Sequence, residues 1–559
     1  MKKIISVLLM MLMLFSVCSA GVYAIGDIGK PNNTIQVNSS KSQVPIIRIL
    51  GDGEPLYNEK QEKIFHIRSM TSAGFSSDDD EDSDVLSSVA NILLPFLVDG
   101  LLNDEWDAYY ENLQKEISDI FSEICLDDNG EVSNGTGISQ ARKDEMAGYL
   151  ARDAKKGKGY YAINDYRFWY DWRLDPIYTA GLLNDYIQEV KKITKCDKVS
   201  IMASCLGTIV TTTYIRLYGT DDLHGVGFTG SVSGGAEALS EAISGKFDID
   251  GYAINRTLID SDYVGEFNVD GFITSTIDLL TATGVIDYLK EGVRETLYAK
   301  LVEGVTSALA LSTLFTFPTY WAAVSPEDYD DALLYVFGPE GSEKRTKYAG
   351  LIEKIENYNT EIRKNYKTTI ESIGENGVNF GAVSKYGFQI LPICKSYDVV
   401  SDQFVSVNHS SFGATTSTIY DTLTDDYIQS RVEAGFADYI SPDKKVDAST
   451  CMYPESTWFM KNVSHSEYTT FERKLLYDVI SADKQIKCGD VVDGLTYSRF
   501  LVYDYGTDIM TTMTEENCNT ENWEADKGTE EPQTIFEKII VRLTAFFNWI
   551  ASLFKFLNK

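Results

Sequence analysis

This sequence has few histidines, lacks closely spaced cysteine pairs, and contains fewer basic than acidic residues. The 559 residues include four histidines and no CxxC pair, so neither residue type shows the spacing of zinc ligands. Lysine and arginine total 50 against 83 acidic residues, and the net charge of -33 would repel a phosphate backbone. We therefore expect no structural metal, no cofactor and no nucleic-acid partner. Proline is also rare, at 12, whereas 44% of residues are hydrophobic, which predicts a large folded core.

The two ends of the chain differ from its body. Lys2 and Lys3 precede an apolar run over 4–17 and small residues up to Ala24, which is typical of a secretory signal over 1–24. The mature protein is therefore expected to be secreted or extracytoplasmic. Residues 511–534 are acidic and polar and predict a linker. Residues 535–559 predict an amphipathic helix of net charge +3, which could lie on an anionic membrane surface or dock on protein.

Seven cysteines remain once Cys18 is removed with the signal. Because seven is odd, six could form up to three disulfides outside the cytoplasm, and one thiol would be left over.

The order of apolar patterns predicts an α/β fold over 40–510. A buried strand over 44–50 is followed by an aromatic strand-like segment over 160–170, a helix over 177–193, a strand over 198–202, a helix from 207 to Gly219 and a strand over 226–229. This alternation is typical of a parallel sheet. Further strands are expected over 387–393 and 457–463. Mostly helical insertions over about 74–145 and 245–380 predict a cap, and the apolar stretch 301–320 is expected to be a buried cap helix rather than a membrane span.

A short run of small residues, Ala203-Ser204-Cys205-Leu206-Gly207, lies between the predicted strand and helix. A nucleophile elbow needs small residues two positions on either side of the reactive residue. Ala203 and Gly207 meet that need around Cys205, whereas Ser204 would be flanked by the bulky Met202 and Leu206. The following helix is expected to lower the pKa of a thiol at its N-terminus. The alternative is a buried, inert cysteine.

Four runs together resemble the lecithin:cholesterol acyltransferase-like branch of the α/β hydrolases over about 44–470. They are YDWRLDP at 170–176, ASCLG at 203–207 where that family has GHSLG, SDQFV at 401–405, and SHS at 464–466. The resemblance implies Asp402 as the acid and His465 as the base, in the chain order nucleophile, acid, histidine. Asp398, Asp421 and Asp425 are rivals for the acid, and His465 could be an ordinary loop histidine.

An oxyanion hole in such folds uses the backbone N–H after the nucleophile and a second one from the loop after an early strand. Here these would come from Leu206 and from Asp52 or its neighbour Gly53, although Gly51-Asp52-Gly53 is equally typical of a plain turn.

The resemblance implies an exported acyl hydrolase or acyltransferase that acts on an acyl ester, with a lipid-like ester favoured. Cysteine in place of serine departs from the family pattern, although cysteine elbows occur in dienelactone-hydrolase-like enzymes. A thiolate paired with imidazolium would form an acyl thioester. The alternative is a catalytically inactive hydrolase fold kept as a binding or lipid-carrier module at the cell surface. A disulfide between Cys205 and Cys196 would favour that alternative.

Overall fold

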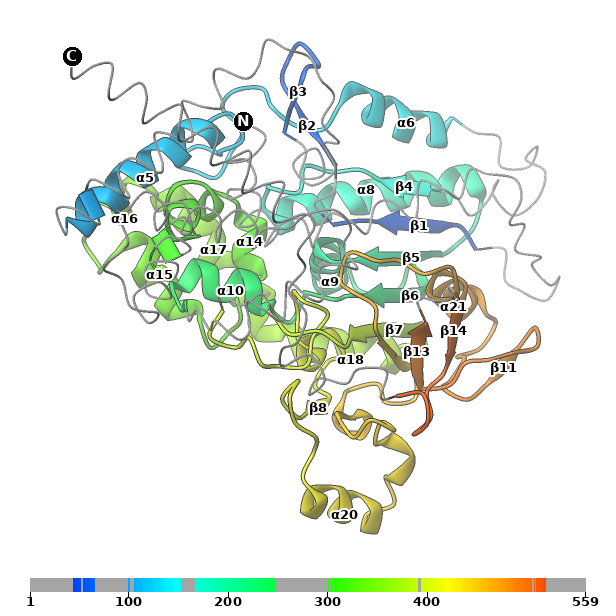
Figure 1. Ribbon diagram of the computed structural model, residues 1–559. Coiled ribbons are helices and arrows are strands. Elements are labelled where there is room, and N and C mark those ends of the chain that lie inside the picture. Colours follow the sequence, from blue (N-terminus) through cyan, green and yellow to red (C-terminus); the bar gives the residue numbers. More distant parts are fainter. Residues whose placement is uncertain are drawn as a thin grey trace.

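A mostly parallel sheet of eight strands forms the centre of the molecule (Figure 1). The computed structural model describes residues 44–51, 54–65, 99–100, 105–151, 166–247, 300, 303–304, 306–390, 394–504, 507 and 509–518. Across the sheet the strands run in the order β14 (Ile509–Thr512), β13 (Phe500–Asp504), β10 (Thr457–Lys461), β7 (Asn379–Tyr386), β6 (Leu223–Thr229), β5 (Val199–Ser204), β1 (Ile46–Ile49) and β4 (Tyr166–Phe168). Every neighbouring pair is parallel except β13 with β14.

Helices cover both faces of this sheet. Helices α8 (Pro176–Thr194), α9 (Leu206–Tyr218) and α18 (Tyr366–Glu375) pack on one side, and α21 (Thr470–Ser481) packs across β5, β6 and β7 on the other. Alternate residues of β5 enter different cores, because Ile201 packs with the helices α8 and α9 and Met202 packs with α21. Strands buried on both faces have nearly continuous apolar sequences, which explains the compact runs seen in β1 and β5.

A group of helices lies beyond the carboxyl ends of the parallel strands, on the left of Figure 1. It contains α5 (Trp106–Phe121), α10 (Glu237–Ser244), α14 (Pro318–Ala322), α15 (Tyr329–Phe337), α16 (Glu343–Lys347) and α17 (Ala349–Glu361). Trp172 stacks on Tyr320 of α14 at 5.7 Å between ring centroids, and the neighbouring Arg173 is fully buried and forms an ion pair of 2.6 Å with Asp171. The run YDWRLDP therefore joins the sheet to these helices.

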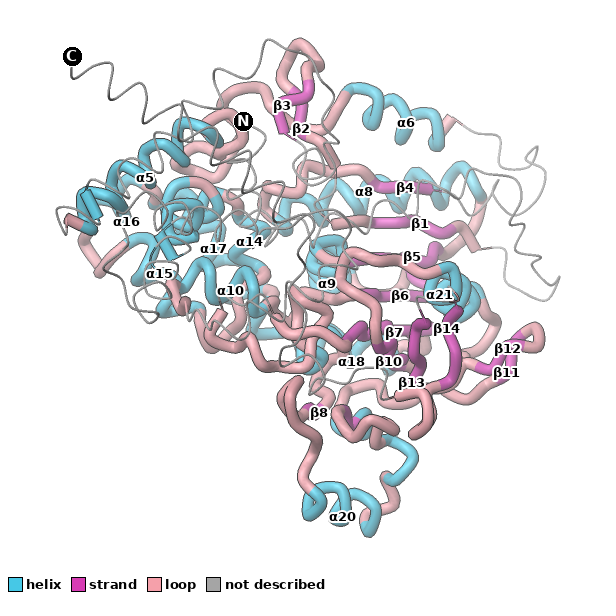
Figure 2. The backbone as a smooth tube through the Cα atoms, viewed as in Figure 1, coloured by secondary structure: helices cyan, strands magenta, loops and turns pink. Residues whose placement is uncertain are grey.

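The remaining elements lie outside the eight-stranded sheet, most of them are short, and Figure 2 shows that loops connect them. They are β2 (Leu56–Tyr57), β3 (Lys63–Phe65), α6 (Gln140–Leu150), η5 (Leu314–Thr316), η6 (Arg363–Asn365), α19 (Val407–Ser410), β8 (Thr415–Thr416), α20 (Asp425–Glu433), η7 (Ala437–Tyr439), β9 (Val446–Asp447), η8 (Ala448–Thr450), β11 (Val491–Val492) and β12 (Leu495–Thr496).

The strand predicted over 387–393 is wrong. The sheet strand is β7, which ends at Tyr386, and Gly387 leaves the sheet with φ 120°. Phe388 then forms an antiparallel bridge with Ser401. The apolar run is therefore buried in a loop that follows β7, and it is not a strand of the sheet. Residues 391–393 lie outside the described residues. Periodicity cannot distinguish these two kinds of buried apolar segment.

The fold also runs further than the boundary predicted at 511. Strand β14 continues to Thr512, and Met513 and Cys518 are buried. The apolar stretch 301–320 is not one long helix in its described part, because η5 and α14 interrupt it. Within the described ranges no helix has the length and apolar character needed to cross a membrane. The predicted signal over 1–24 and the predicted helix over 535–559 lie outside the described residues.

Candidate active site

Cys205 occupies the sharp turn between β5 and α9. Its backbone has φ 48° and ψ -128°, a conformation that costs a non-glycine residue about 1–3 kcal/mol and is characteristic of functional sites. A Cβ at Gly207 would lie 2.4 Å from the carbonyl oxygen of Ile49, so only glycine lets α9 start this close to the end of β1. The turn therefore has the strained backbone and the close approach that define a nucleophile elbow.

Backbone hydrogen bonds hold the elbow in place. The N–H of Cys205 donates to the carbonyl oxygen of Thr229, the last residue of β6, at 3.3 Å. The carbonyl oxygen of Cys205 accepts from the N–H of Thr208 at 2.9 Å and from its hydroxyl at 2.6 Å. The backbone of Cys205 is thus held by β5, by β6 and by the first turn of α9.

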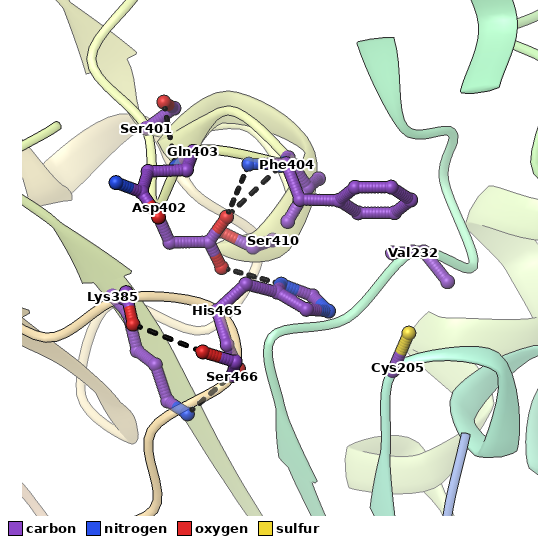
Figure 3. Close-up of polar contacts among 12 residues, drawn as sticks. Cys205, Val232, Lys385, Ser401, Asp402, Gln403, Phe404, Ser410, His465 and Ser466 are labelled. Atoms are coloured by element: carbon purple, nitrogen blue, oxygen red, sulfur yellow. Dashed lines mark hydrogen bonds and ion pairs between the residues drawn. The ribbon is translucent and has the colours of Figure 1, made fainter. Parts of the chain in front are cut away.

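The structure brings His465 and Asp402 together beside this turn, from two loops at the same end of the sheet. His465 follows β10 and Asp402 lies beyond β7. Nδ1 of His465 donates to Oδ2 of Asp402 at 2.7 Å, and its backbone N–H donates to the Asp402 carbonyl at 2.8 Å. Oδ1 of Asp402 accepts from the N–H groups of Phe404 and Val405, at 3.1 and 2.9 Å. In Figure 3 the imidazole lies between the Asp402 carboxylate and the Cys205 side chain.

The three side chains form an electrostatically coupled and nearly inaccessible group. Burial alone would lower the pKa of His465, but the Asp402 carboxylate and the Cys205 sulfur raise it to about 10. Cys205 is 4% exposed, His465 5% and Asp402 0%. The carboxylate and the sulfur therefore favour an imidazolium over a neutral ring at this position.

Two further residues shape the space around the imidazole. A Cβ at Gly230, directly after β6, would lie 3.0 Å from Cε1 and 3.2 Å from Nδ1 of His465, and Gly230 has φ 50°. The ring of Phe404 lies 5.0 Å from the His465 ring. Nothing in the sequence marks Gly230 as part of a site, because the run GSVSGG at 230–235 has the composition of an ordinary turn.

Only one of the two predicted donors of the oxyanion hole lies among the described residues. Leu206 is the first residue of α9, where backbone N–H groups have no acceptor within the helix. Asp52 and Gly53, the two candidates for the second donor, lie outside the described residues. The close approach of Gly207 to Ile49 and Leu50 does bring the segment just before Asp52 against the start of α9.

The three rival aspartates, and the described histidines other than His465, lie away from this group. The Asp398 carbonyl accepts from the N–H of Ile419, Asp421 is hydrogen bonded to Thr418, and Asp425 begins the exposed helix α20. The ring of His224 contacts the carbonyl of Ala482 at 2.9 Å. His409 lies 2.9 Å from Glu237. His66 lies outside the described residues.

The seven cysteines from Cys125 to Cys518 are all described, and no disulfide joins any two of them. The Cys196–Cys205 bond that would have favoured an inactive protein is therefore not present in the structure. Among the described residues, no group of three or more His, Cys, Asp or Glu side chains is arranged to hold a metal ion. Two surface cavities of about 530 and 410 Å³ are lined by other residues, among them Val432 and Arg499 in the larger and Tyr329 and Arg345 in the smaller.

Comparison with known proteins adds little to these observations. No protein-family model matches the sequence, and no curated protein matches it. A chain in the crystal structure of the Tle4–Tli4 complex is similar in structure, with 12% identity and a TM-score of 0.24 over 62% of this chain and 75% of that one. A likeness at that level carries no argument. The α/β-hydrolase fold predicted from the sequence is confirmed by the parallel sheet, its covering helices and the elbow after β5.

Proposed function

We propose that this protein is an exported acyl hydrolase or acyltransferase in which Cys205 is the nucleophile. The observation that carries the proposal is the placement of His465, whose Nδ1 is bound to Asp402 at 2.7 Å while its ring faces a cysteine at a strained elbow. A carboxylate so placed fixes the ring tautomer and stabilises the imidazolium.

The proposed reaction has two halves. The thiolate of Cys205 attacks the carbonyl carbon of an ester, and the carbonyl electrons move to oxygen, where the Leu206 N–H stabilises them. When the oxyanion collapses, the C–O bond breaks, and Nε2 of His465 gives its proton to the departing alkoxide. An acyl thioester remains on Cys205 and an alcohol leaves.

In the second half His465 acts as a base. Nε2 takes a proton from water or from an acceptor alcohol, whose oxygen attacks the thioester carbonyl. Collapse expels the Cys205 thiolate and releases an acid or a new ester. The raised pKa of His465, about 10, supports the first half directly, because the ring starts protonated beside the sulfur.

A lipid-like ester is the substrate class we favour. Support comes from the resemblance to acyltransferase-like hydrolases and from the helices that lie over the carboxyl ends of the strands. Export by residues 1–24 and attachment to an anionic membrane surface by residues 535–559 belong to the same proposal and rest on the sequence pattern alone.

The proposal is tested by trapping the thioester. Protein is mixed with a short-chain and a long-chain p-nitrophenyl ester, quenched in acid and mapped by mass spectrometry. We expect an acyl adduct on Cys205 that hydroxylamine removes and that Cys205→Ala lacks. An adduct that persists in Cys205→Ala, or no adduct in the wild type, would contradict it.

The burial of all three side chains favours a second candidate function, a binding or lipid-carrier module without catalysis. That protein would bind a lipid reversibly and form no thioester. Native mass spectrometry of the same mixtures before the acid quench distinguishes the two functions, since a carrier retains the intact long-chain ester and loses it on denaturation.

A further inference from the structure

A buried pair of opposite charges lies beside the three candidate residues and is not part of them. Lys385 is on β7, one residue before its end, and Glu472 is in the first turn of α21. Nζ of Lys385 lies 3.4 Å from Oε1 of Glu472, and the two side chains are 1% and 0% exposed. Lysine and glutamate are almost never fully buried unless they are paired.

The lysine is bonded to the loop that carries His465. Nζ donates to the carbonyl oxygen of His465 at 3.4 Å and to that of Glu467. The Tyr468 ring lies 5.0 Å from the same nitrogen. Lys385 therefore bonds to the backbone of His465 and of Glu467, and it also contacts the side-chain ring of Tyr468.

The glutamate is bonded to the strand that supports the elbow. The Thr229 hydroxyl donates to Oε1 of Glu472, and the Thr229 carbonyl accepts from the N–H of Cys205 at 3.3 Å. Oε2 of Glu472 accepts from the N–H of Thr469 at 3.3 Å, as part of the capping box of α21. A continuous path thus runs from Cys205 through Thr229, Glu472 and Lys385 to His465.

Stability alone does not explain such a pair. Replacing a buried ion pair by apolar residues of similar volume is often neutral or stabilising by about 1–4 kcal/mol, because both charges must be desolvated. Proton transfer between His465 and Cys205 requires their relative position to be held within about 0.5 Å, and the pair connects the elements that carry them. Lys385 bonds to the loop that carries His465, and Glu472 bonds to Thr229 at the end of β6, which in turn holds the backbone of Cys205.

We propose that Lys385 and Glu472 are positioning residues that set the distance and orientation of the His465 ring relative to Cys205. This inference rests on the proposed function, since it assigns the pair a part in that same site. In this role, Lys385 and Glu472 neither contact the substrate nor transfer a proton.

Several charged groups surround the site: Asp402 and Cys205 face His465, whereas Arg473 and Arg48 lie with Glu472 near Tyr468. Burial raises the pKa of Tyr468 above its usual value. Removing Lys385 and Glu472 together keeps the net charge near the site unchanged, so an effect on His465 would come from geometry.

The test is the double variant Lys385→Met with Glu472→Gln. Methionine keeps most of the volume of lysine but donates nothing, and glutamine can still accept from Thr229. The matched control is Lys461→Met with Asp443→Asn, which removes a pair of 3.2 Å at the end of β10, with side chains 7% and 2% exposed, that bonds instead to Cys518. Two quantities are measured, the titration of the His465 Cε1–H signal by NMR and ester turnover.

We expect the double variant to fold and its His465 pKa to fall by at least about one unit, toward the ordinary value, because the ring leaves its partners. We expect kcat to fall at least about tenfold with little change in KM, and the control to match the wild type. A folded double variant with the wild-type His465 titration would overturn the inference.

The NMR titration does not need turnover, so it also tests the inference if the wild type proves inactive on esters. If the double variant does not fold, Thr229→Val removes only the hydroxyl bond to Glu472 and is judged by the same titration.

Discussion

At the scale of single residues, the site depends on positions where a side chain would not fit. Gly230 has φ 50° and lies against the His465 ring, and Gly207 lies against the end of β1. Cys205 itself has φ 48°, so its side chain projects from a turn that L-residues rarely adopt. The sequence indicated the elbow through its small residues, but nothing in the sequence indicated that the glycine after β6 leaves room for the imidazole.

Gly230→Ala tests this packing. The added methyl group would displace the His465 ring by several tenths of an ångström, and we expect alkylation of Cys205 at neutral pH to slow at least about tenfold. The control is Gly377→Ala, which has a similar φ of 71° but no atom within 4 Å of the added methyl group. Both variants are expected to lose about 1–2 kcal/mol of unfolding free energy from backbone strain. Equal alkylation rates in the two variants would refute the role given to Gly230.

Asp402→Asn tests the electrostatics of His465. The folded-state pKa of about 10 lies above the ordinary 6.5, so this interaction stabilises the fold fully below about pH 6.5 and is lost as pH rises through about 10. We therefore expect the wild type to exceed Asp402→Asn in unfolding free energy by about 3–5 kcal/mol at pH 6 and by much less near pH 10. Chemical denaturation at several pH values measures the difference. A difference in unfolding free energy between the two proteins that grows as the pH rises would contradict this prediction.

At the scale of elements, the junction of β1, β5 and α9 is the part that the sequence predicted best. Compact β-rich runs and a helix ending at Gly219 are local patterns, and the structure has β5 and α9 within a few residues of the predicted bounds. Strand β7 was missed because NFGAVSKY contains Gly381, Ser384 and Lys385, which do not form an apolar run. Lys385 is buried by its pairing with Glu472, and that partner lies 87 positions further along the chain, beyond the reach of any local pattern.

Gly207→Ala tests the close contact between α9 and β1. A methyl group 2.4 Å from the Ile49 carbonyl must move the backbone, and we expect a loss of about 1–3 kcal/mol in unfolding free energy. Gly181→Ala, within α8, is the control, because its methyl group would meet only the Tyr218 hydroxyl at 3.5 Å. Alanine is the better helix former, so Gly181→Ala should be neutral or gain up to about 1 kcal/mol. Thermal unfolding that ranks the two variants in the opposite order would contradict this account.

At the scale of the whole molecule, three loops far apart in sequence meet at one end of a parallel sheet. The resemblance to acyltransferase-like hydrolases implied Asp402 and His465 as the partners of Cys205, and these residues do meet because the carboxyl ends of parallel strands share an edge. The sequence could not predict how deeply the site is buried, because burial depends on how the surrounding helices pack over it.

Membrane binding by the terminal segment 535–559 can be tested at the scale of the whole molecule. With a net charge of -33, the chain as a whole should avoid anionic membranes, whereas this segment carries +3. We expect the mature protein to sediment with vesicles that contain anionic lipid, less so at high salt, and a variant lacking 535–559 to stay in solution. Equal sedimentation of the two proteins would place membrane binding elsewhere or exclude it.

The central claim is that Cys205 and His465 act as a nucleophile and its partner. The most direct measurement is the rate of alkylation of Cys205 between about pH 5 and about pH 9, mapped by mass spectrometry in the wild type and in His465→Ala, with Cys205→Ser to identify the site. The account predicts labelling of Cys205 that remains fast below pH 7 and slows at least about tenfold in His465→Ala, since the imidazolium stabilises the thiolate. Labelling that follows the pH profile of an ordinary thiol and is the same in both proteins would contradict it.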